Sequence, residues 1–381
     1  MSTATSPHPT PATGLAAVDR QSRILGAVTL AATLAAALVR PLGDVVAFIV
    51  AAAALALLAA CVGRAVEALG DRVGPAATGI LQSALGNLPE LLILIFALHS
   101  GLTTVVQATI VGSILANVAL VLGVAFIAGG LRHGTQQFSG VAARDLGLNL
   151  MLAIAALAIP SLTAHLHSPA AGHERALSVI VAVVLLVAFG LSLLHTLRPH
   201  RPSAASETAA AATAPEEAAP GSPDEHAAAW PLWLAVAVLA VTGVLAALVS
   251  DWFVAALTPA MRALHISDAF AGLVIVAIAG NAVENFVGIQ LALKNRAEHA
   301  LQVVLQSPVQ IAMFVAPLVL LVAPLLGSGS FTLVLPPLLL VALLLSALLA
   351  VFITLDGEST WYEGTVLVAL YALLAAAFWW G

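Results

Sequence analysis

Charged residues are scarce in this chain: Asp, Glu, Lys and Arg together make up 8% of its 381 residues. A soluble domain of this length carries about 25% charged residues, so the composition excludes that class. Hydrophobic residues instead reach 61% of the sequence, and the mean hydropathy is +1.07. Long apolar runs separated by short polar breaks predict an all-α polytopic membrane protein.

Other groups are missing as well. The single cysteine, Cys61, excludes an intramolecular disulfide and argues against a structural zinc site. The apolar segments lack the Ser/His, paired Asp or His/Glu groupings that an intramembrane protease or lipid transferase requires, so we predict no enzyme and no cofactor. The net charge of −6 comes largely from one acidic segment and gives no reason to expect a nucleic-acid partner.

A spanning helix needs about 20 apolar residues. This rule predicts eleven transmembrane helices, at residues 23–40, 44–63, 75–99, 102–129, 141–160, 175–196, 230–250, 268–292, 299–326, 331–354 and 361–380. The chain is then expected to comprise a disordered tail (1–22) without a signal-peptide pattern, an extra N-terminal helix (23–42), a first five-helix repeat (43–197), an acidic cytoplasmic linker (198–229) and a second five-helix repeat (230–381).

The basic residues indicate an orientation. With the N-terminus in the cytoplasm, ten of the 13 Lys and Arg residues fall in inside loops, and the other three, Arg40, Arg175 and Arg262, fall outside. Five helices per repeat is an odd number, so the two repeats are expected to have inverted orientation, as in many transporters. The Ala-rich and Arg-rich composition favours a bacterial source and the inner membrane.

Two apolar segments carry the same polar pattern. Gly86-Asn87-Leu88-Pro89-Glu90 is followed 23 residues later by Ser113, and Gly280-Asn281-Ala282-Val283-Glu284 is followed 23 residues later by Ser307. A carboxylate near the centre of a bilayer costs about 2.5–3.5 kcal/mol on insertion scales, so such residues usually face a cavity or an ion path. The repetition predicts one shared site at mid-membrane.

The residue types in these segments suit a cation. Each Gly is expected to lie on the same helical face as the Glu four residues later, and Gly and Pro89 to free backbone carbonyls. Carbonyl, carboxylate and amide oxygens are ligands for hard cations. The candidate metal-binding residues are Glu90, Glu284, Asn87, Asn281, Ser113, Asn117, Ser307 and Gln310, with Gln107, Gln302 and Gln306 as further lining candidates.

Two carboxylates in a low-dielectric site require neutralisation by protons or by a cation. Cation binding therefore competes with protonation, which is the minimum requirement for cation/proton antiport. Other readings stay open at this point: each Glu could bond a neighbouring helix, and the small residues, Gly112 and Gly123 above all, could serve close helix packing. A scaffold without transport would leave both carboxylates unexplained.

The stretch from Gly86 to Leu91, continued by Gly112-Ser113-Ile114-Leu115-Ala116-Asn117 and Gly123, resembles the first repeat of the calcium/proton antiporter family, within the cation/calcium exchanger superfamily. The stretch from Gly280 to Glu284, with Ala292-Leu293-Lys294 and 307–312, resembles the second repeat. The resemblance implies two inverted five-helix repeats, one acidic residue per repeat at a central site, and export of cytoplasmic Ca2+ in exchange for H+. These ions are the expected substrates.

The chain departs from the family pattern at three places. Asn285 stands where the family usually has His, Gln306-Ser307-Pro308 where it has Gly-Ser-Ser, and Gln82 where it often has Asn. Without that His, a titratable group beside the second Glu is absent. Sodium/calcium exchange and monovalent cation/proton antiport on the same scaffold are therefore the alternatives.

Overall fold

The computed structural model describes residues 18, 20–73, 85–166, 170–196 and 230–379. In chain order its helices are α1 (Arg20–Leu38), η2 (Arg40–Leu42), α2 (Asp44–Val73), α4 (Leu88–His99), α5 (Thr103–Leu115), η3 (Ala116–Val121), α6 (Leu122–His133), α7 (Gly140–His165), α8 (Glu174–Thr196), α10 (Leu232–Leu264), α11 (Asp268–Phe270), η4 (Ala271–Val276), α12 (Ala277–Gly280), α13 (Ala282–Leu293), α14 (Ala297–Gln310), η5 (Ile311–Val315), α15 (Ala316–Val322), η6 (Ala323–Leu326), α16 (Pro337–Thr354) and α17 (Trp361–Trp379). Two short strands, β1 (Gln136–Gln137) and β2 (Glu358–Ser359), pair antiparallel.

The prediction of a helical polytopic membrane protein is confirmed. Among the described residues, nine helices are long and apolar enough to cross a membrane, and a tenth span results if the bent pair Asp268–Gly280 and Ala282–Leu293 counts as one. The helix Leu88–His99 is apolar but shorter. The count of eleven spans stays a prediction, because residues 74–84, which belong to the predicted span 75–99, lie outside the described part.

Several predicted boundaries are wrong. The helix α10 continues to Leu264 instead of ending at 250, and α2 continues to Val73 instead of 63. Hydropathy falls at Arg64 and Asp251, but Ala-rich segments follow that favour helix, so the backbone continues. The predicted span 331–354 begins as a helix only at Pro337, which occupies the first helical position.

The calls on the N-terminal tail and the linker fall largely outside the described residues. The helix α1 already begins at Arg20, so the end of the predicted tail 1–22 is helical. The predicted linker 198–229 lies outside the described residues, as does Gln82.

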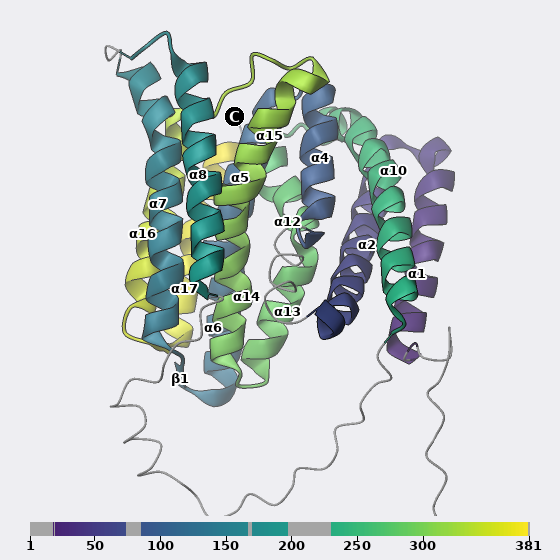
Figure 1. The fold of residues 1–381 in the computed structure, drawn as a ribbon, viewed down its shortest axis with the longest axis horizontal. Helices are drawn as coiled ribbons and strands as arrows, with labels where there is room; N and C mark the ends of the chain where they lie inside the picture. Colours follow the sequence, from purple (N-terminus) through teal and green to yellow (C-terminus); the bar gives the residue numbers. More distant parts are fainter. Residues whose placement is uncertain (1–17, 19, 74–84, 167–169, 197–229, 380–381) are drawn as a thin grey trace, which may run out of the picture.

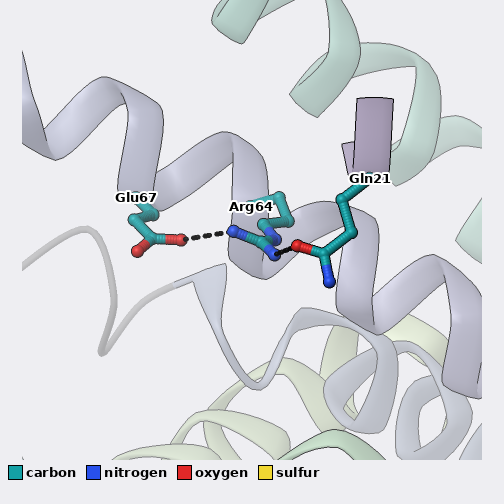
Figure 2. Close-up of polar contacts among 3 residues, drawn as sticks. All are labelled: Gln21, Arg64 and Glu67. Atoms are coloured by element: carbon teal, nitrogen blue, oxygen red, sulfur yellow. Dashed lines mark hydrogen bonds and ion pairs between the residues drawn. The ribbon is translucent and has the colours of Figure 1, made fainter. Parts of the chain in front are cut away.

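Three helices form one side of the molecule. In Figure 1, α1, α2 and α10 lie together, separated from α7, α8 and α16 by the central helices α4, α5, α12, α13 and α14. Phe48 of α2 stacks on Phe253 of α10, with ring centroids 4.7 Å apart. Arg64 of α2 donates from Nη2 to Oε1 of Gln21 in α1 over 3.3 Å, and its Nη1 lies 3.6 Å from Oε2 of Glu67; Figure 2 shows both contacts. These contacts are solvent-exposed, so each contributes about 0–1 kcal/mol, and apolar packing holds the group together.

Glycines allow the central helices to touch backbone to backbone. A Cβ atom on Gly272 of η4 would lie 2.6 Å from the Val105 carbonyl oxygen of α5. A Cβ on Gly112 of α5 would overlap the backbone of Leu273, and one on Gly123 of α6 would lie 2.7 Å from the carbonyl oxygen of Gly364 in α17. The expectation that Gly112 and Gly123 serve close packing is confirmed, and the crossing of α5 with η4 brings the two halves of the chain together.

This crossing leads to a stability prediction. We expect Gly272→Ala to destabilise the protein by about 1–3 kcal/mol, because the added methyl group overlaps the α5 backbone, which cannot move aside cheaply. The control is Gly63→Ala in α2, where a Cβ meets nothing within 4 Å and helix propensity improves. Thermal unfolding of the purified proteins in detergent compares the two, and equal midpoints would contradict the close crossing.

Candidate cation site

The second motif lies where a helix is interrupted, and the first lies at the start of a helix. The segment Asp268–Gly280 and the helix α13 meet at an angle of 64°, and Asn281 is the N-cap of α13. In the first half, Asn87 is the N-cap of α4. Both helices have 12 residues, and Glu90 and Glu284 each occupy the third helical position. The two carboxylates therefore stand at the amino ends of two short helices, where the helix dipole favours negative charge.

Two details of the sequence interpretation are wrong. Gly280 ends α12 and Glu284 belongs to α13, so the bend prevents them from sharing one helical face. Pro89 lies in the first turn of α4, where its missing N–H would have no helical partner anyway. The interruption of the helix therefore does not depend on a hydrogen bond lost at Pro89.

The two N-cap asparagines do not serve as caps. An N-cap Asn normally accepts a bond from an N–H of the first turn, but among the described residues neither side chain makes that bond. Asn87 Nδ2 donates to Oε1 of Gln310 over 2.7 Å, and Asn281 Nδ2 donates to Oγ of Ser113 over 3.0 Å. Each amide thus connects its own half of the chain to a helix of the other half.

Asn281 is the centre of a buried network. Its Nδ2 also donates to the Ala277 carbonyl oxygen, and its Oδ1 accepts from Oγ of Ser307 over 3.1 Å. The Ser113 hydroxyl donates to Oε1 of Glu90, so the hydrogen-bonded chain Ser307, Asn281, Ser113, Glu90 runs from α14 to α4. Asn117 Nδ2 donates to the Ser113 carbonyl oxygen over 2.8 Å and lies 3.4 Å from both Asn281 and Ser307.

The two carboxylates differ in their surroundings. Glu90 is 1% exposed, whereas Glu284 is half-buried. A Cβ on Gly280 would lie 3.6 Å from Cγ of Glu90. The segment just before Glu284 therefore packs directly against Glu90, and a side chain at position 280 would fill the space beside the carboxylate.

The unpartnered atoms of this network are all oxygen acceptors. Within the described part of the chain, Oε2 of Glu90, Oε2 of Glu284 and Oδ1 of Asn117 are buried without a hydrogen-bond partner. The hydroxyl groups of Ser113 and Ser307 and the side-chain amide of Asn281 already donate hydrogen bonds to protein acceptors. An excess of oxygen acceptors, including two carboxylates, is an environment that a hard cation or protons would complete.

The structure thus brings the predicted residues together. Seven of the eight candidates are joined by side-chain hydrogen bonds in two groups, Asn87 with Gln310 and Glu90 with Ser113, Asn281, Ser307 and Asn117, and Glu284 lies three residues after Asn281 in the same motif. The sequence analysis did not anticipate Oδ1 of Asn285, which is also buried without a partner among the described residues. Its position next to Glu284 was the available signal.

Two further lining candidates lie elsewhere. Gln107 donates to the carbonyl oxygens of Thr332 and Val334, and the exposed Gln302 donates to Glu298. The described residues contain no group of three or more His, Cys, Asp and Glu side chains. The acceptor atoms around Glu90 and Glu284 are carboxylate, amide and hydroxyl oxygens, a set that suits hard cations better than soft metals.

Two π-helical segments flank the network. The segment η3 begins directly before Asn117, and η5 begins directly after Gln310. A π-helix shifts the backbone hydrogen-bond register and often occurs at functional sites. The two segments occupy corresponding positions in the two halves, and sequence patterns did not predict them.

A fold of broken helices around an oxygen-lined site defines a class of membrane transport protein. The sodium/calcium exchanger protein family matches residues 44–198 and 234–380. A Ca2+/H+ antiporter of Aphanothece halophytica is 35% identical over 334 residues, covering 87% of this chain and 89% of that protein. A Ca2+/H+ antiporter of Synechocystis sp. is 36% identical over 346 residues, covering 88% and 91%.

Solved structures agree with the sequence comparison. The structure of native YfkE matches with a TM-score of 0.75 and 30% identity, and the match covers 94% of this chain and 99% of that one. The chain belongs to the sodium/calcium exchanger protein family.

The central position of Asn281 leads to a second prediction. We expect Asn281→Ala to destabilise the protein by about 1–3 kcal/mol, because the Ser307 hydroxyl loses its buried acceptor and Ser113 loses a donor. The matched control is Asn285→Ala, four residues along the same segment, where the buried Oδ1 has no partner among the described residues. Thermal unfolding in detergent measures both, and a larger loss for Asn285→Ala would contradict the network.

Proposed function

We propose that this protein is an antiporter that exports cytoplasmic Ca2+ in exchange for H+. The cation is bound at mid-membrane between Glu90 and Glu284, and the site opens alternately to the two sides. The observation that carries this proposal is a set of three buried oxygens without hydrogen-bond partners among the described residues: Oε2 of Glu90, Oε2 of Glu284 and Oδ1 of Asn117. The neighbouring donors, Ser113, Asn281 and Ser307, already donate to other protein acceptors.

Calcium fits the ligand chemistry. Ca2+ takes six to eight oxygen ligands from carboxylates, amides and backbone carbonyls, with tolerant geometry. Glu90 and Glu284 supply the two negative charges that balance a divalent cation, and Asn117 adds a neutral oxygen. The similar proteins named Ca2+/H+ antiporters support the same choice of ions.

Protons are the natural counter-ion at the same oxygens. Two carboxylates in an apolar interior without a counter-charge are strongly disfavoured. When Ca2+ leaves, protons restore neutrality at Glu90 and Glu284, and their departure restores the cation site. Because one set of atoms serves both ions, binding of one excludes the other, and exchange follows without a separate proton channel.

The two-fold architecture supports alternating access. In Figure 1, α4 lies in the upper half of the molecule and α13 in the lower half, with α12 between them. We propose that the two segments 43–197 and 230–381 are inverted repeats within eleven spans. The excess of Arg and Lys in the predicted inside loops supports a cytoplasmic N-terminus and a bacterial inner membrane.

The test is transport by proteoliposomes with an imposed pH gradient, offered Ca2+, Mg2+, Mn2+, Na+ or K+ in turn. We expect Ca2+ movement against the proton flux, and loss of at least about 100-fold in rate for Glu90→Gln and for Glu284→Gln, since each removes an ionised ligand. The matched control is Glu67→Gln, whose exposed carboxylate pairs with Arg64 outside the site.

Each outcome decides between the candidate functions. Calcium movement that requires a sodium gradient and ignores the pH gradient would establish sodium/calcium exchange instead. Movement of Na+ or K+ alone against protons would establish monovalent antiport. Full exchange in either Glu→Gln variant, with the Glu67→Gln control unchanged, would refute a site made of two carboxylates.

The residue after Glu284 gives a further prediction. We expect Asn285→His to add a pH dependence to the transport rate between about pH 5.5 and 7.5, because imidazole titrates in this range and would lie beside the cation site. The control is Asn285→Gln, which has no titratable group. A pH profile that stays the same in both variants would mean that position 285 lies away from the proton path.

A further inference from the structure

The two helices that carry the carboxylates also end alike. At the end of α4, the N–H of Gly101 donates to the Leu98 carbonyl oxygen and the N–H of Leu102 to that of Ala97. At the end of α13, the N–H of Asn295 donates to the Ala292 carbonyl oxygen and the N–H of Arg296 to that of Leu291. Both are Schellman motifs, with Gly101 (φ 76°) and Asn295 (φ 57°) in the left-handed conformation.

Side chains from the end of α6 and from the loop after it bind the end of α13. The loop between α6 and α7 places Nε2 of Gln136 3.0 Å from the Ala292 carbonyl oxygen and 2.9 Å from Oδ1 of Asn295. The exposed His133 lies with Nε2 2.9 Å from the Leu293 carbonyl oxygen, and it is the donor because a carbonyl oxygen only accepts. Gln136 is 2% exposed, so both protons of its amide nitrogen are used inside the protein.

The Gln136 residue is also held by the part of the chain that carries it, through the β1–β2 ladder and the neighbouring α6. Its backbone pairs with Ser359 in the β1–β2 ladder, and the neighbouring Phe138 N–H donates to the Gly357 carbonyl oxygen over 2.8 Å. A Cβ atom on Gly129 would overlap Oε1 of Gln136. The amide is thus enclosed between α6 and the end of α13.

The end of α4 has a corresponding but weaker contact. Oγ of Ser328, in the loop between η6 and α16, donates to the Leu98 carbonyl oxygen over 3.1 Å. Leu98 and Ala292 hold the same position before the ends of their helices, since each carbonyl also accepts the bond from the left-handed residue. The two contacts are therefore equivalent. In each half of the chain, the carboxylate-bearing helix is followed by one long helical segment, and the loop after that segment binds the far end of the carboxylate-bearing helix of the other half.

We propose that Gln136 is a positioning residue for Glu284: it holds the far end of α13 and so fixes the direction of this helix beside the cation site. The interruption at Asn281 means that no continuous helix sets this direction, so it depends on the packing of α13 against α6 and α14 and on the contacts at its two ends. Ser328 plays the same role for Glu90 through α4, with one hydrogen bond where Gln136 and His133 together make three. The effect on transport rests on the proposed function, and the effect on α13 does not.

The test combines hydrogen exchange with transport by the full-length protein. We expect Gln136→Ala to speed amide exchange in peptides covering residues 284–296 about tenfold, because the buried hydrogen bonds at the end of the helix are lost. In proteoliposomes we expect the KM for Ca2+ to rise about tenfold with the maximal rate changed by less than about twofold, since a displaced Glu284 weakens binding first.

The neighbouring residue provides the matched control. Gln137 lies in the same strand, is exposed, and points to Glu358 instead of α13, so Gln137→Ala is expected to change neither measurement. Gln136→Glu has nearly the same shape but, when ionised, only accepts, and is expected to reproduce Gln136→Ala. If Gln136→Ala does not fold, Asn295→Gly removes one acceptor and keeps the left-handed turn, and is expected to give a smaller change of the same kind.

Three results would overturn the proposal. Exchange in 284–296 equal to that of the Gln137→Ala control is one, and faster exchange spread evenly over all helices is another, because that indicates general loss of stability. An unchanged KM for Ca2+ despite faster local exchange is the third. A wild-type protein that moves no Ca2+ would refute the proposed function instead, and hydrogen exchange alone would then decide whether Gln136 holds α13.

Discussion

The structure depends on enclosing two carboxylates in an apolar interior. An unneutralised charge in such surroundings is costly, so the surrounding helices must supply hydrogen bonds to the carboxylates and leave room for a counter-charge. Ser113 donates a hydrogen bond to Glu90, and the helix ends at Asn87 and Asn281 direct partial positive charge toward both carboxylates. The atoms that these groups leave without partners are acceptor oxygens, and the proposed cation binding rests on them. The close crossing of α5 and η4 at Gly112 and Gly272 brings the two halves of the chain close together.

The asparagine in each motif explains how the two halves come to share one site. A capping role would turn the amide back onto its own helix, and the site would lose its cross-connections. In the structure, Asn87 bonds Gln310 and Asn281 bonds Ser113, so each amide reaches a helix of the other half. These hydrogen bonds hold the motif segments against the other half of the chain, although the helix is interrupted at Asn281.

Much of the site was predictable from sequence, because its residues are polar, lie in apolar segments and recur at equal spacing. Those properties identify Glu90, Glu284 and their amide and hydroxyl neighbours without any coordinates. The 64° bend, the extension of α10 to Leu264 and the extended chain before Pro337 were not predictable, because they depend on tertiary contacts or on local geometry that hydropathy does not register. Gln107 shows the same limit: its polarity marked it as a lining candidate, but it binds the carbonyls of Thr332 and Val334.

The contacts at the far ends of α4 and α13 help to fix the directions of these two short helices. The direction of α13 is not set by the helix before it, because the chain bends at Asn281. A helix of 12 residues is about 18 Å long. If the end that lies away from the carboxylate were not held, a small change in the direction of the helix would displace the carboxylate at its amino end. Contacts within one half would hold the helix only relative to that half. Because the loop with Gln136 and the loop with Ser328 each belong to the other half, both carboxylates are held relative to one another. The far end of α13 accepts three such hydrogen bonds and that of α4 accepts one, so on the proposed role of Gln136 the direction of Glu284 is the better fixed of the two, although its side chain is the less buried. The two carboxylates are therefore proposed to be positioned in different ways. Glu90 is enclosed by surrounding residues, whereas Glu284 is less buried and is positioned through the contacts at the end of its helix.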